Sequence, residues 1–507
     1  MLFNSYTFIF LFLPLTLALY YLLRSVDLHR QSVVLLVLAS LLYYAWWDPK
    51  YLLLIAFLIV FNYFLARGLL ASRNTTPICA KGLLISGLAV NLAFLCYYKY
   101  ANFVVDNVNW LWGSQLDLAA VVLPIGISFF TFQKIAFLVD VHQGKVRQIN
   151  FVDFLLFVTF FPQLIAGPIV HHSEVMPQFN RARAFSLHQC ALGLTFFAIG
   201  LCKKMLLADT AAQFATPQFQ AAAGGMHLDF LAAWSGALAY SAQLYFDFSA
   251  YSDMAIGLGQ LFGIDLPLNF NSPYKAHNII DFWRRWHMTL SRFLRDYLYI
   301  PLGGNRNGPT RRHVNLFLTM LLGGIWHGAG WTFVVWGALH GTYLGINHAW
   351  NAFKSALTLG RLGPPRLTAL GARLLTFASV VVGWVFFRAD DVGTALSILK
   401  GMAGGNGFAL PTSLHVLAVD LPASQAPVDS GFAFAVAAAF LLLAMTAPNS
   451  QELLGYSGCR TPSSYAAAGS CPPTWQPSWH WALYTGTLLV VSLTMFSRVS
   501  EFIYFQF

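Results

Sequence analysis

The sequence predicts an all-α, polytopic integral membrane protein, with residues 1–507 forming a single membrane-embedded domain whose core motifs lie in 163–341. The chain is 57% hydrophobic and only 10% charged, whereas soluble proteins carry about 25% charged residues. Its mean hydropathy is +0.59. A hydrocarbon core about 30 Å thick needs about 20 mostly apolar residues per helix. Such runs recur along the chain, so we expect about 11 or more spanning helices, with re-entrant and interfacial helices between them.

The first spans follow from four apolar runs separated by basic loops, at residues 6–23, 31–47, 51–66 and 82–98. Arg24 and Arg30 follow the first run, and further cations separate the third run from the fourth. Because cytoplasmic loops carry an excess of Lys and Arg, this pattern predicts an outer N-terminus. Residues 101–117 carry Asp106 and Asp117 without a cation, so we expect an outer loop there.

The next two runs are less regular. The run at 119–141 contains Gln133, Lys134 and Asp140, which predicts a helix that faces the protein interior. The run at 151–170 ends in a segment with two prolines and a glycine, which interrupt a helix. Broken backbone at membrane depth is tolerated where it is buried in protein or lines a cavity, so we expect a re-entrant or cavity element.

The middle of the chain holds two long runs, 187–208 and 228–263, followed by the most basic segment. Residues 271–313 contain eight Lys or Arg and two Asp, and 8 − 2 = +6 of the total net charge of +10. This segment is therefore predicted to be cytoplasmic. Its apolar residues repeat at three and four positions, which predicts an amphipathic helix lying in the membrane interface.

The remaining runs complete the predicted bundle. Residues 314–327 and 331–347 are expected to form a hairpin around 328–330, and further spans are expected at 373–387, 432–445 and 481–496. The acidic block 389–430 is expected outside, and Cys459 and Cys471 are the cysteines that share one loop. No internal repeat is visible, which argues against a transporter built from inverted repeats.

Two histidines are the strongest candidates for chemistry. His327 lies in GGIWHGAG at the end of an apolar run, and an ionisable residue at membrane depth is by default a functional-site hypothesis. The glycines around it let another chain or a ligand approach closely. His287 lies in FWRRWHMTLS at the cytoplasmic edge. With a pKa of about 6.5, one histidine can serve as base or acyl acceptor while the other positions or polarises the acyl group.

Other polar residues receive weaker predictions. His340 is predicted to be structural. Asp247 and Asp253 either orient a histidine, pair with an arginine, or join two helices as a buried pair; the arginines in question are Arg284, Arg285 and Arg295. No serine-hydrolase elbow, phosphate-binding loop or dinucleotide fingerprint occurs in a strand–helix context.

His171 and His172 have the look of a metal-binding pair. Adjacent residues do not share a helix face, however, and no acidic or cysteine partner stands at ligand spacing in the sequence. We therefore predict no metal site.

Four stretches together give the chain a resemblance to a known family. They are QLIAGPIV (163–170), YFDFSAYSDMAIG (245–257), the segment NFNSPYKAHNIIDFWRRWHMTLSRFLRDYLYIPLGGNR (269–306) and GGIWHGAGWTFVVWGALHG (323–341). They resemble the membrane-bound O-acyltransferase (MBOAT) family, and most of all its bacterial branch, which acetylates alginate or cellulose or transfers D-alanine to teichoic acid. The terminal FIYFQF is also similar, so the resemblance covers nearly the whole chain.

The resemblance implies a fold in which helices enclose a tunnel, with His327 as the active-site histidine at its constriction and His287 as the second histidine. Residues that would bind substrate or donor, or support the histidines, are Asp247, Asp253, Asn271, Arg284, Arg285, Trp286 and Trp326. It also implies transfer of an acyl group, most simply acetyl, from a cytoplasmic thioester toward hydroxyls of an exported polysaccharide such as alginate or cellulose.

The expected surroundings follow from that activity. We expect no permanently bound cofactor and no metal, with acetyl-CoA or another acyl thioester as donor. The expected partners are a periplasmic acetyltransferase or esterase-like protein, an exopolysaccharide and the lipid bilayer of the bacterial inner membrane, and not nucleic acid. Alternatives are a transporter or channel without covalent chemistry, D-alanyl transfer to teichoic acid, and a scaffold that recruits a soluble acetyltransferase.

Overall fold

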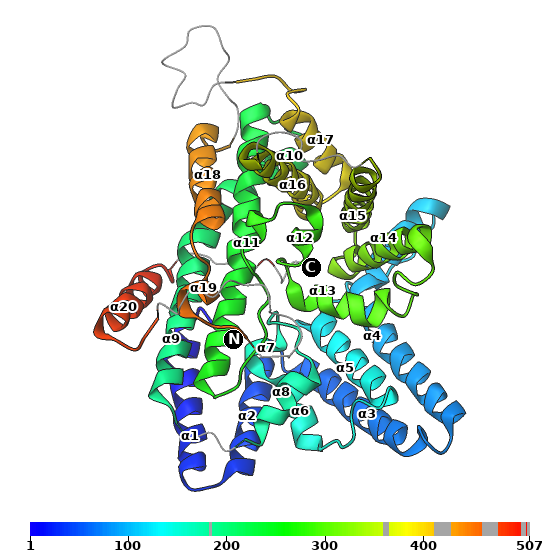
Figure 1. Ribbon diagram of the computed structural model, residues 1–507, viewed down its shortest axis with the longest axis vertical. Coiled ribbons are helices and arrows are strands. Elements are labelled where there is room, and N and C mark those ends of the chain that lie inside the picture. Colours follow the sequence, from blue (N-terminus) through cyan, green and yellow to red (C-terminus); the bar gives the residue numbers. More distant parts are fainter. Residues whose placement is uncertain (182–184, 358–364, 410–426, 459–474, 498–502, 504–507) are drawn as a thin grey trace. The chain divides into compact units, whose positions relative to one another are not determined.

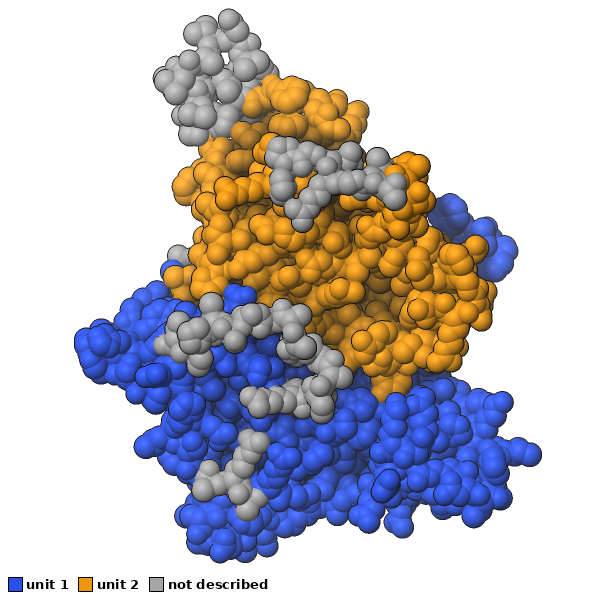
Figure 2. All heavy atoms as spheres, viewed as in Figure 1, with its two compact units in different colours: residues 1–201, 251–268, 450–496 blue, residues 202–250, 269–449, 497–507 orange. Residues whose placement is uncertain are grey.

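The computed structural model describes residues 1–181, 185–357, 365–409, 427–458, 475–497 and 503. Every regular element in these residues is helical, which confirms the predicted class (Figure 1). The Cys459–Cys471 loop and the terminal FIYFQF, apart from Ile503, lie outside the described residues. The chain divides into two compact units, coloured separately in Figure 2. Whether these two units form the single domain expected from the sequence stays a prediction.

Unit 1 comprises Met1–Leu201, Tyr251–Leu268 and Ser450–Phe496. A π-helical turn (Phe8–Phe12) leads into its first helix, and its helices are α1 (Leu13–Ser25), α2 (His29–Ala45), α3 (Lys50–Ser72), α4 (Pro77–Trp112), α5 (Ile127–His142), α6 (Phe151–Thr159), α7 (Phe161–Leu164), α8 (His172–Phe179), α9 (Leu187–Cys202), α19 (Ser450–Leu454) and α20 (Trp479–Thr494). The long helix α11 (Phe230–Leu261) contributes residues to both units.

Unit 2 comprises Cys202–Ala250, Asn269–Asn449 and Ser497–Phe507. Its elements are the π-helical segment η2 (Lys203–Ala208), α10 (Asp209–Ala223), the 3₁₀ turn η3 (Pro273–Lys275), α12 (Ile279–Trp283), α13 (Met288–Leu294), the π-helical turn η4 (Arg295–Tyr299), α14 (Gly308–His327), α15 (Trp331–Ala356), α16 (Pro365–Arg388), α17 (Val392–Met402) and α18 (Ser430–Thr446).

Several helices are long and apolar enough to cross a bilayer. Among the described residues five stretches meet both conditions: Phe8–Ser25, Lys50–Ser72, Pro77–Trp112, Leu187–Ala223 and Arg366–Arg388. Shorter apolar helices occur as well, at Val392–Met402 and Ser430–Thr446. The chain is thus a helical membrane protein with several apolar spans, while the total of about 11 or more stays a prediction.

The expected interior face of α5 and the broken helix after it are both present. Gln133, Lys134 and Asp140 are all buried. The helix breaks at Phe160, between α6 and α7, and the N–H of Phe161 donates to the Ser40 hydroxyl at 3.1 Å. Because a neighbouring helix supplies that acceptor, the interrupted backbone is buried in protein rather than exposed to lipid.

Three segments differ from the sequence-based expectation. The outer loop predicted at 101–117 is largely helical, since α4 continues to Trp112. Residues 119–126 are not helical, and α5 begins after Pro124 and the left-handed Gly126. The single amphipathic helix predicted within 271–313 is instead split into α12 and α13, because His287 adopts a left-handed conformation between them. The side chains of Ile279, Phe282, Trp283 and Trp286 are buried in the core of unit 2.

The predicted hairpin of α14 and α15 is present, and glycines determine how closely its helices pack. A Cβ placed on Gly324 would lie 2.4 Å from the carbonyl oxygen of Phe333. A Cβ on Gly337 would lie 2.6 Å from the carbonyl oxygen of Met320. Both obstacles are backbone atoms, which cannot rotate away. The glycines near His327 therefore admit the neighbouring helix, and this contact places the end of α14.

Replacing Gly337 with alanine should separate α14 from α15 and destabilise the protein by about 1–3 kcal/mol, the usual cost of overpacking. A Cβ on Gly345, which lies about two turns further along α15, meets nothing within 4 Å. Gly345→Ala is therefore the matched control and should be neutral or stabilising, because alanine favours helix by about 1 kcal/mol over glycine. Thermal unfolding of detergent-purified protein checks both. Equal midpoints for the two variants would contradict the close-packing account.

Candidate active site

His327 is the last residue of α14 and lies among aromatic rings. Its side chain is buried, and its ring centroid is 4.9 Å from Trp326, 5.0 Å from Trp336 and 5.2 Å from Phe387. All three contacts are steep or edge-on, so the rings form walls around the imidazole. Trp326 thus lies beside His327 as expected. An imidazole so enclosed is shielded from bulk water, which suits a base acting on a reactive ester.

Trp336, which contacts His327, also contacts His340. The Trp336 and His340 rings are 4.8 Å apart, and Trp283 Nε1 donates to His340 Nδ1 at 3.3 Å. His340 is fully buried in α15. These contacts agree with the structural role predicted for it, and they make His340 and His327 neighbours through one shared ring.

His287 is oriented by a residue that the sequence argument did not single out. Asn269 Oδ1 lies 3.0 Å from His287 Nδ1 and also accepts from the Thr289 hydroxyl at 2.9 Å. The N–H of Thr289 points to the same oxygen at 3.4 Å, which identifies that atom as the carbonyl of the amide. His287 Nδ1 is therefore the donor, and Nε2 carries the lone pair. The motif NFNSPYK contains Asn269, but only the fold shows which of its asparagines meets the histidine.

The backbone of His287 is unusual as well. Its φ of 42° and ψ of 54° lie in the left-handed region, where non-glycine residues are uncommon. Strained residues of this kind cluster at functional sites. His287 lies between α12 and α13, outside the spanning helices, and burial lowers its pKa to about 3. The ring is accordingly neutral at physiological pH, and so weak a base suits positioning or polarising the acyl group better than taking a proton.

Aromatic rings connect the surroundings of the two histidines. His287 packs edge-on against Phe248 at 4.8 Å, and Trp286 lies 5.1 Å from Phe270 and 4.8 Å from Trp384. Trp384 in turn stacks on Trp336 at 6.0 Å. Trp283 contacts His340, at 5.2 Å. Trp286 is part of the aromatic core of unit 2.

Asn271 and Arg285 hold the backbone near His287. Arg285 pairs with Asp281 at 2.8 Å, and its Nη1 donates to the Asn271 carbonyl at 3.3 Å. The Asn271 side chain accepts from Asn449 at 3.1 Å. In the structure both residues therefore link the segment before α12 to its neighbours, and a direct part in binding stays a prediction.

The predicted partners of Asp247 need correction. Neither a histidine nor Arg284, Arg285 or Arg295 pairs with it among the described contacts; Lys204 Nζ lies 2.8 Å away and is shared with Asp209 at 2.8 Å. The Ile503 N–H also donates to Asp247 at 3.0 Å. This buried network joins α11 to η2. It corresponds to the predicted alternative in which Asp247 joins two helices as part of a buried pair. Asp247 and Lys204 are both almost fully buried, and an unpaired charge at either position would be strongly destabilising. Each residue therefore compensates the charge of the other.

Asp253 belongs to unit 1 and not to the unit that contains both histidines. It is buried and accepts a 2.5 Å hydrogen bond from the Ser450 hydroxyl. A part for Asp253 in the site stays a prediction.

Arg284 is exposed and belongs to a cationic cluster with Arg312, His313 and His348. Arg312 Nη2 lies 3.3 Å from His313 Nε2, and the rings of His313 and His348 are 6.2 Å apart. His348 follows the apolar part of α15, and burial lowers its pKa, as do the positive charges of Arg312, His313 and Arg284. A cluster that disfavours its own positive charge is suited to an anionic ligand.

A family model and several known proteins match much of this chain. The model of the MBOAT, membrane-bound O-acyltransferase family, matches residues 87–356, a range that contains both histidines. The peptidoglycan O-acetyltransferase of Helicobacter pylori is 47% identical over 439 residues, which cover 81% of this chain and 81% of that protein. The probable alginate O-acetylase AlgI of Pseudomonas aeruginosa is 46% identical, over 79% of this chain and 75% of that protein.

A more distant relative is the teichoic acid D-alanyltransferase of Lacticaseibacillus rhamnosus, 26% identical over 69% of this chain and 87% of that protein. The much higher identity to the two acetylating proteins supports the predicted branch. The sequence-based identification is confirmed: the chain belongs to the membrane-bound O-acyltransferase family and is a membrane-bound O-acetylase.

Proposed function

We propose that this protein passes an acetyl group from a cytoplasmic thioester, most simply acetyl-CoA, toward hydroxyl groups of an exported polysaccharide at the bacterial inner membrane. The observation that carries the proposal is the pair of buried imidazoles in unit 2, each held by its own set of contacts, in a chain closely similar to two acetylating proteins. His327 acts as base or acyl acceptor, and His287 positions or polarises the acyl group. Helices of the bundle enclose the tunnel that leads to His327.

The position of the cationic cluster supports transfer across part of the membrane. His313 lies near the start of α14 and His327 ends it, so 14 residues at 1.5 Å each separate them by about 21 Å along the axis. His348 lies near the end of α15. An anionic donor would dock at the cluster, and its acyl group would reach inward.

Replacing Arg284 and Arg312 together with alanine should raise the KM for acetyl-CoA about tenfold, with little change in kcat. The reason is that removing cations weakens docking in the ground state and the transition state alike. The matched control is Arg306→Ala, which removes an exposed cation of the same basic segment that is not in the cluster. Steady-state kinetics at low and high salt would check this, since the difference should shrink as salt screens the charges. An unchanged KM in the double variant would contradict donor docking at the cluster.

Two acceptors are supported about equally. The relatives named for peptidoglycan and for alginate differ by one per cent in identity, at 47% and 46%. We propose that the acceptor is an exported glycan of one of these two classes. The final transfer would use a periplasmic acetyltransferase or esterase-like partner. Incubation of membranes containing the enzyme and labelled acetyl-CoA with each glycan, followed by analysis of the released sugars, distinguishes the two.

The decisive experiment uses purified protein in liposomes loaded with labelled acetyl-CoA. Release of CoA that depends on His327 supports the acyltransferase, whereas solute flux without thioester loss would support a transporter. A D-alanyl thioester that is consumed in preference to acetyl-CoA would support the teichoic acid alternative. Loss of both histidines without effect on acetylation in cells would instead indicate a scaffold.

A further inference from the structure

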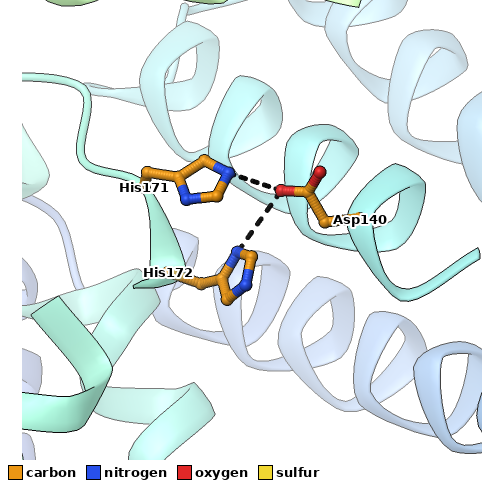
Figure 3. A group of neighbouring side chains, drawn as sticks. All are labelled: Asp140, His171 and His172. Atoms are coloured by element: carbon orange, nitrogen blue, oxygen red, sulfur yellow. Dashed lines mark hydrogen bonds and ion pairs between the residues drawn. The ribbon is translucent and has the colours of Figure 1, made fainter. Parts of the chain in front are cut away.

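A second constellation of chemically competent side chains lies in unit 1, remote in sequence from both active-site histidines. His171 and His172, at the start of α8, meet Asp140 in the last turn of α5 (Figure 3). His171 Nε2 lies 2.5 Å from Asp140 Oδ2, and His172 Nδ1 lies 3.4 Å from the same oxygen. Asp140 and His172 are buried, and His171 is partly exposed. We propose that Asp140, His171 and His172 form a binding site for a divalent transition-metal ion of the zinc class.

The structure removes both reasons for which the sequence argued against a metal here. The missing acid is Asp140, which is 31 residues away in the chain. The rule that adjacent residues point to different faces holds within a helix, but His171 is the N-cap of α8, with an extended backbone at φ −94° and ψ 141°. Only His172 is helical, so the two rings can converge, and their centroids are 4.4 Å apart.

The ligand atoms are close to the spacing that a metal requires. They all lie within 4.8 Å of one another. Zinc binds imidazole nitrogen and carboxylate oxygen at about 2.0–2.2 Å, so tetrahedral ligand atoms stand about 3.3 Å apart. Small side-chain rotations would bring the three atoms to that spacing. Two imidazoles and one carboxylate suit Zn²⁺ or Co²⁺ rather than Mg²⁺ or Ca²⁺, which prefer oxygen ligands.

Neighbouring groups leave the inner oxygen of the carboxylate to the histidines. Lys145 Nζ bonds Asp140 Oδ1 at 2.8 Å, while both imidazoles face Oδ2. The carboxylate can thus give Oδ2 to a metal ion and keep Lys145 on Oδ1. Ser173 Oγ lies 2.6 Å from His171 Nδ1, and the Ser173 N–H donates to the same nitrogen at 3.4 Å, so without an ion Nε2–H faces the Asp140 carboxylate. A metal ion on Nε2 would select the other tautomer, in which Nδ1–H donates to the Ser173 hydroxyl. The edge of the Phe137 ring packs on His172 and limits its rotation.

Such a site would join two helices across the interrupted segment. It connects the end of α5 to the start of α8, directly after the irregular stretch 165–171 that follows α7. A bound ion stabilises the folded state in proportion to its occupancy. Three protein ligands also leave a coordination position open on the partly exposed side of His171.

The test uses the full chain, purified in detergent through a tag without histidine and stripped of metal with a chelator. After addition of Co²⁺ we expect d–d absorption in the visible range, which Zn²⁺ abolishes, and one ion per chain by mass spectrometry. His172→Ala and His171→Arg should each weaken binding at least tenfold, since even indirect partners of metal ligands cost about 10–100-fold. The arginine can still donate to the Asp140 carboxylate, which preserves that contact between α5 and α8.

The matched control is His29→Ala, because His29 also lies beside a carboxylate, at 3.6 Å from Asp27, but is not a member of the cluster. This variant should bind Co²⁺ as the wild type does. Absence of visible absorption in the wild type, or equal binding by His172→Ala and the wild type, would overturn the proposal and leave Asp140 as a hydrogen-bonded junction between α5 and α8.

Discussion

Replacing His327 with alanine should lower kcat for acetyl transfer by about 10²–10⁴-fold, the usual contribution of a positioned general base. If the imidazole also accepts the acyl group, the loss lies at the upper end of that range. Membrane insertion and expression should stay normal, because Trp336 and Phe387, which both contact the ring, also contact each other at 5.3 Å and keep the end of α14 packed. Release of CoA from labelled acetyl-CoA by purified protein measures the change.

The matched control for this variant is His340→Gln. Both histidines contact Trp336, but His340 accepts a hydrogen bond from Trp283, and a glutamine oxygen can accept the same bond. We expect His340→Gln to lower thermal stability slightly and to leave kcat within a few-fold of the wild type. If His327→Ala retained normal turnover, or if His340→Gln lost as much activity, the assignment of His327 would have to be abandoned.

Replacing His287 with asparagine should lower kcat by about 10²-fold or more, with a smaller change in KM. Asparagine tolerates the left-handed backbone at φ 42° and can donate to Asn269 Oδ1, so the fold around α13 should persist. What is lost is the neutral ring nitrogen opposite Nδ1. Single-turnover measurement separates this chemical effect from donor binding.

A contrast comes from His348→Asn, which removes an imidazole of the cationic cluster rather than one of the active-site pair. It should change the KM for acetyl-CoA more than kcat. The double variant His327→Ala/His287→Asn should be little slower than the slower single variant, because residues that act as one unit are not additive. Full additivity would indicate that the two histidines work in independent steps.

The fold was predictable where one property decides it. Apolar runs of bilayer length located α2, α11, α18 and α20 within two residues at each end, and they also located the hairpin of α14 and α15 and the interruption after α6. Other helices extend well beyond the predicted runs, as α15 does to Ala356. The runs failed where polarity was read as loop, as in 101–112 of α4. They also failed where an apolar period was read as one helix, because a single left-handed residue at 287 divides it.

The candidate site was predictable in its chemistry and not in its contacts. His327 stood out because placing an ionisable residue at the end of an apolar run costs free energy, which makes a function there the default hypothesis. His287 stood out as a second histidine, at the cytoplasmic edge of the same block of motifs. The residues that contact them did not stand out. Nothing in the sequence distinguishes Asn269 from other asparagines in loops. Asp247, which pairs with Lys204, could equally have paired with an arginine. Hydrogen-bond and ion-pair partners depend on which side chains meet after folding, and sequence spacing does not determine this.

The sequence by itself determined that this protein is a helical membrane protein and, through its motifs, that it resembles the membrane-bound O-acyltransferases, with two candidate histidines, because hydrophobic run length, charge placement and short motifs are local properties of the chain. Only the tertiary structure decided which groups serve those histidines, why the glycines stand where they do, and that Asp140 meets His171 and His172. The reason is physical: hydrogen bonds, ion pairs and metal coordination act over about 2–4 Å, and only folding brings residues distant in the chain within that range.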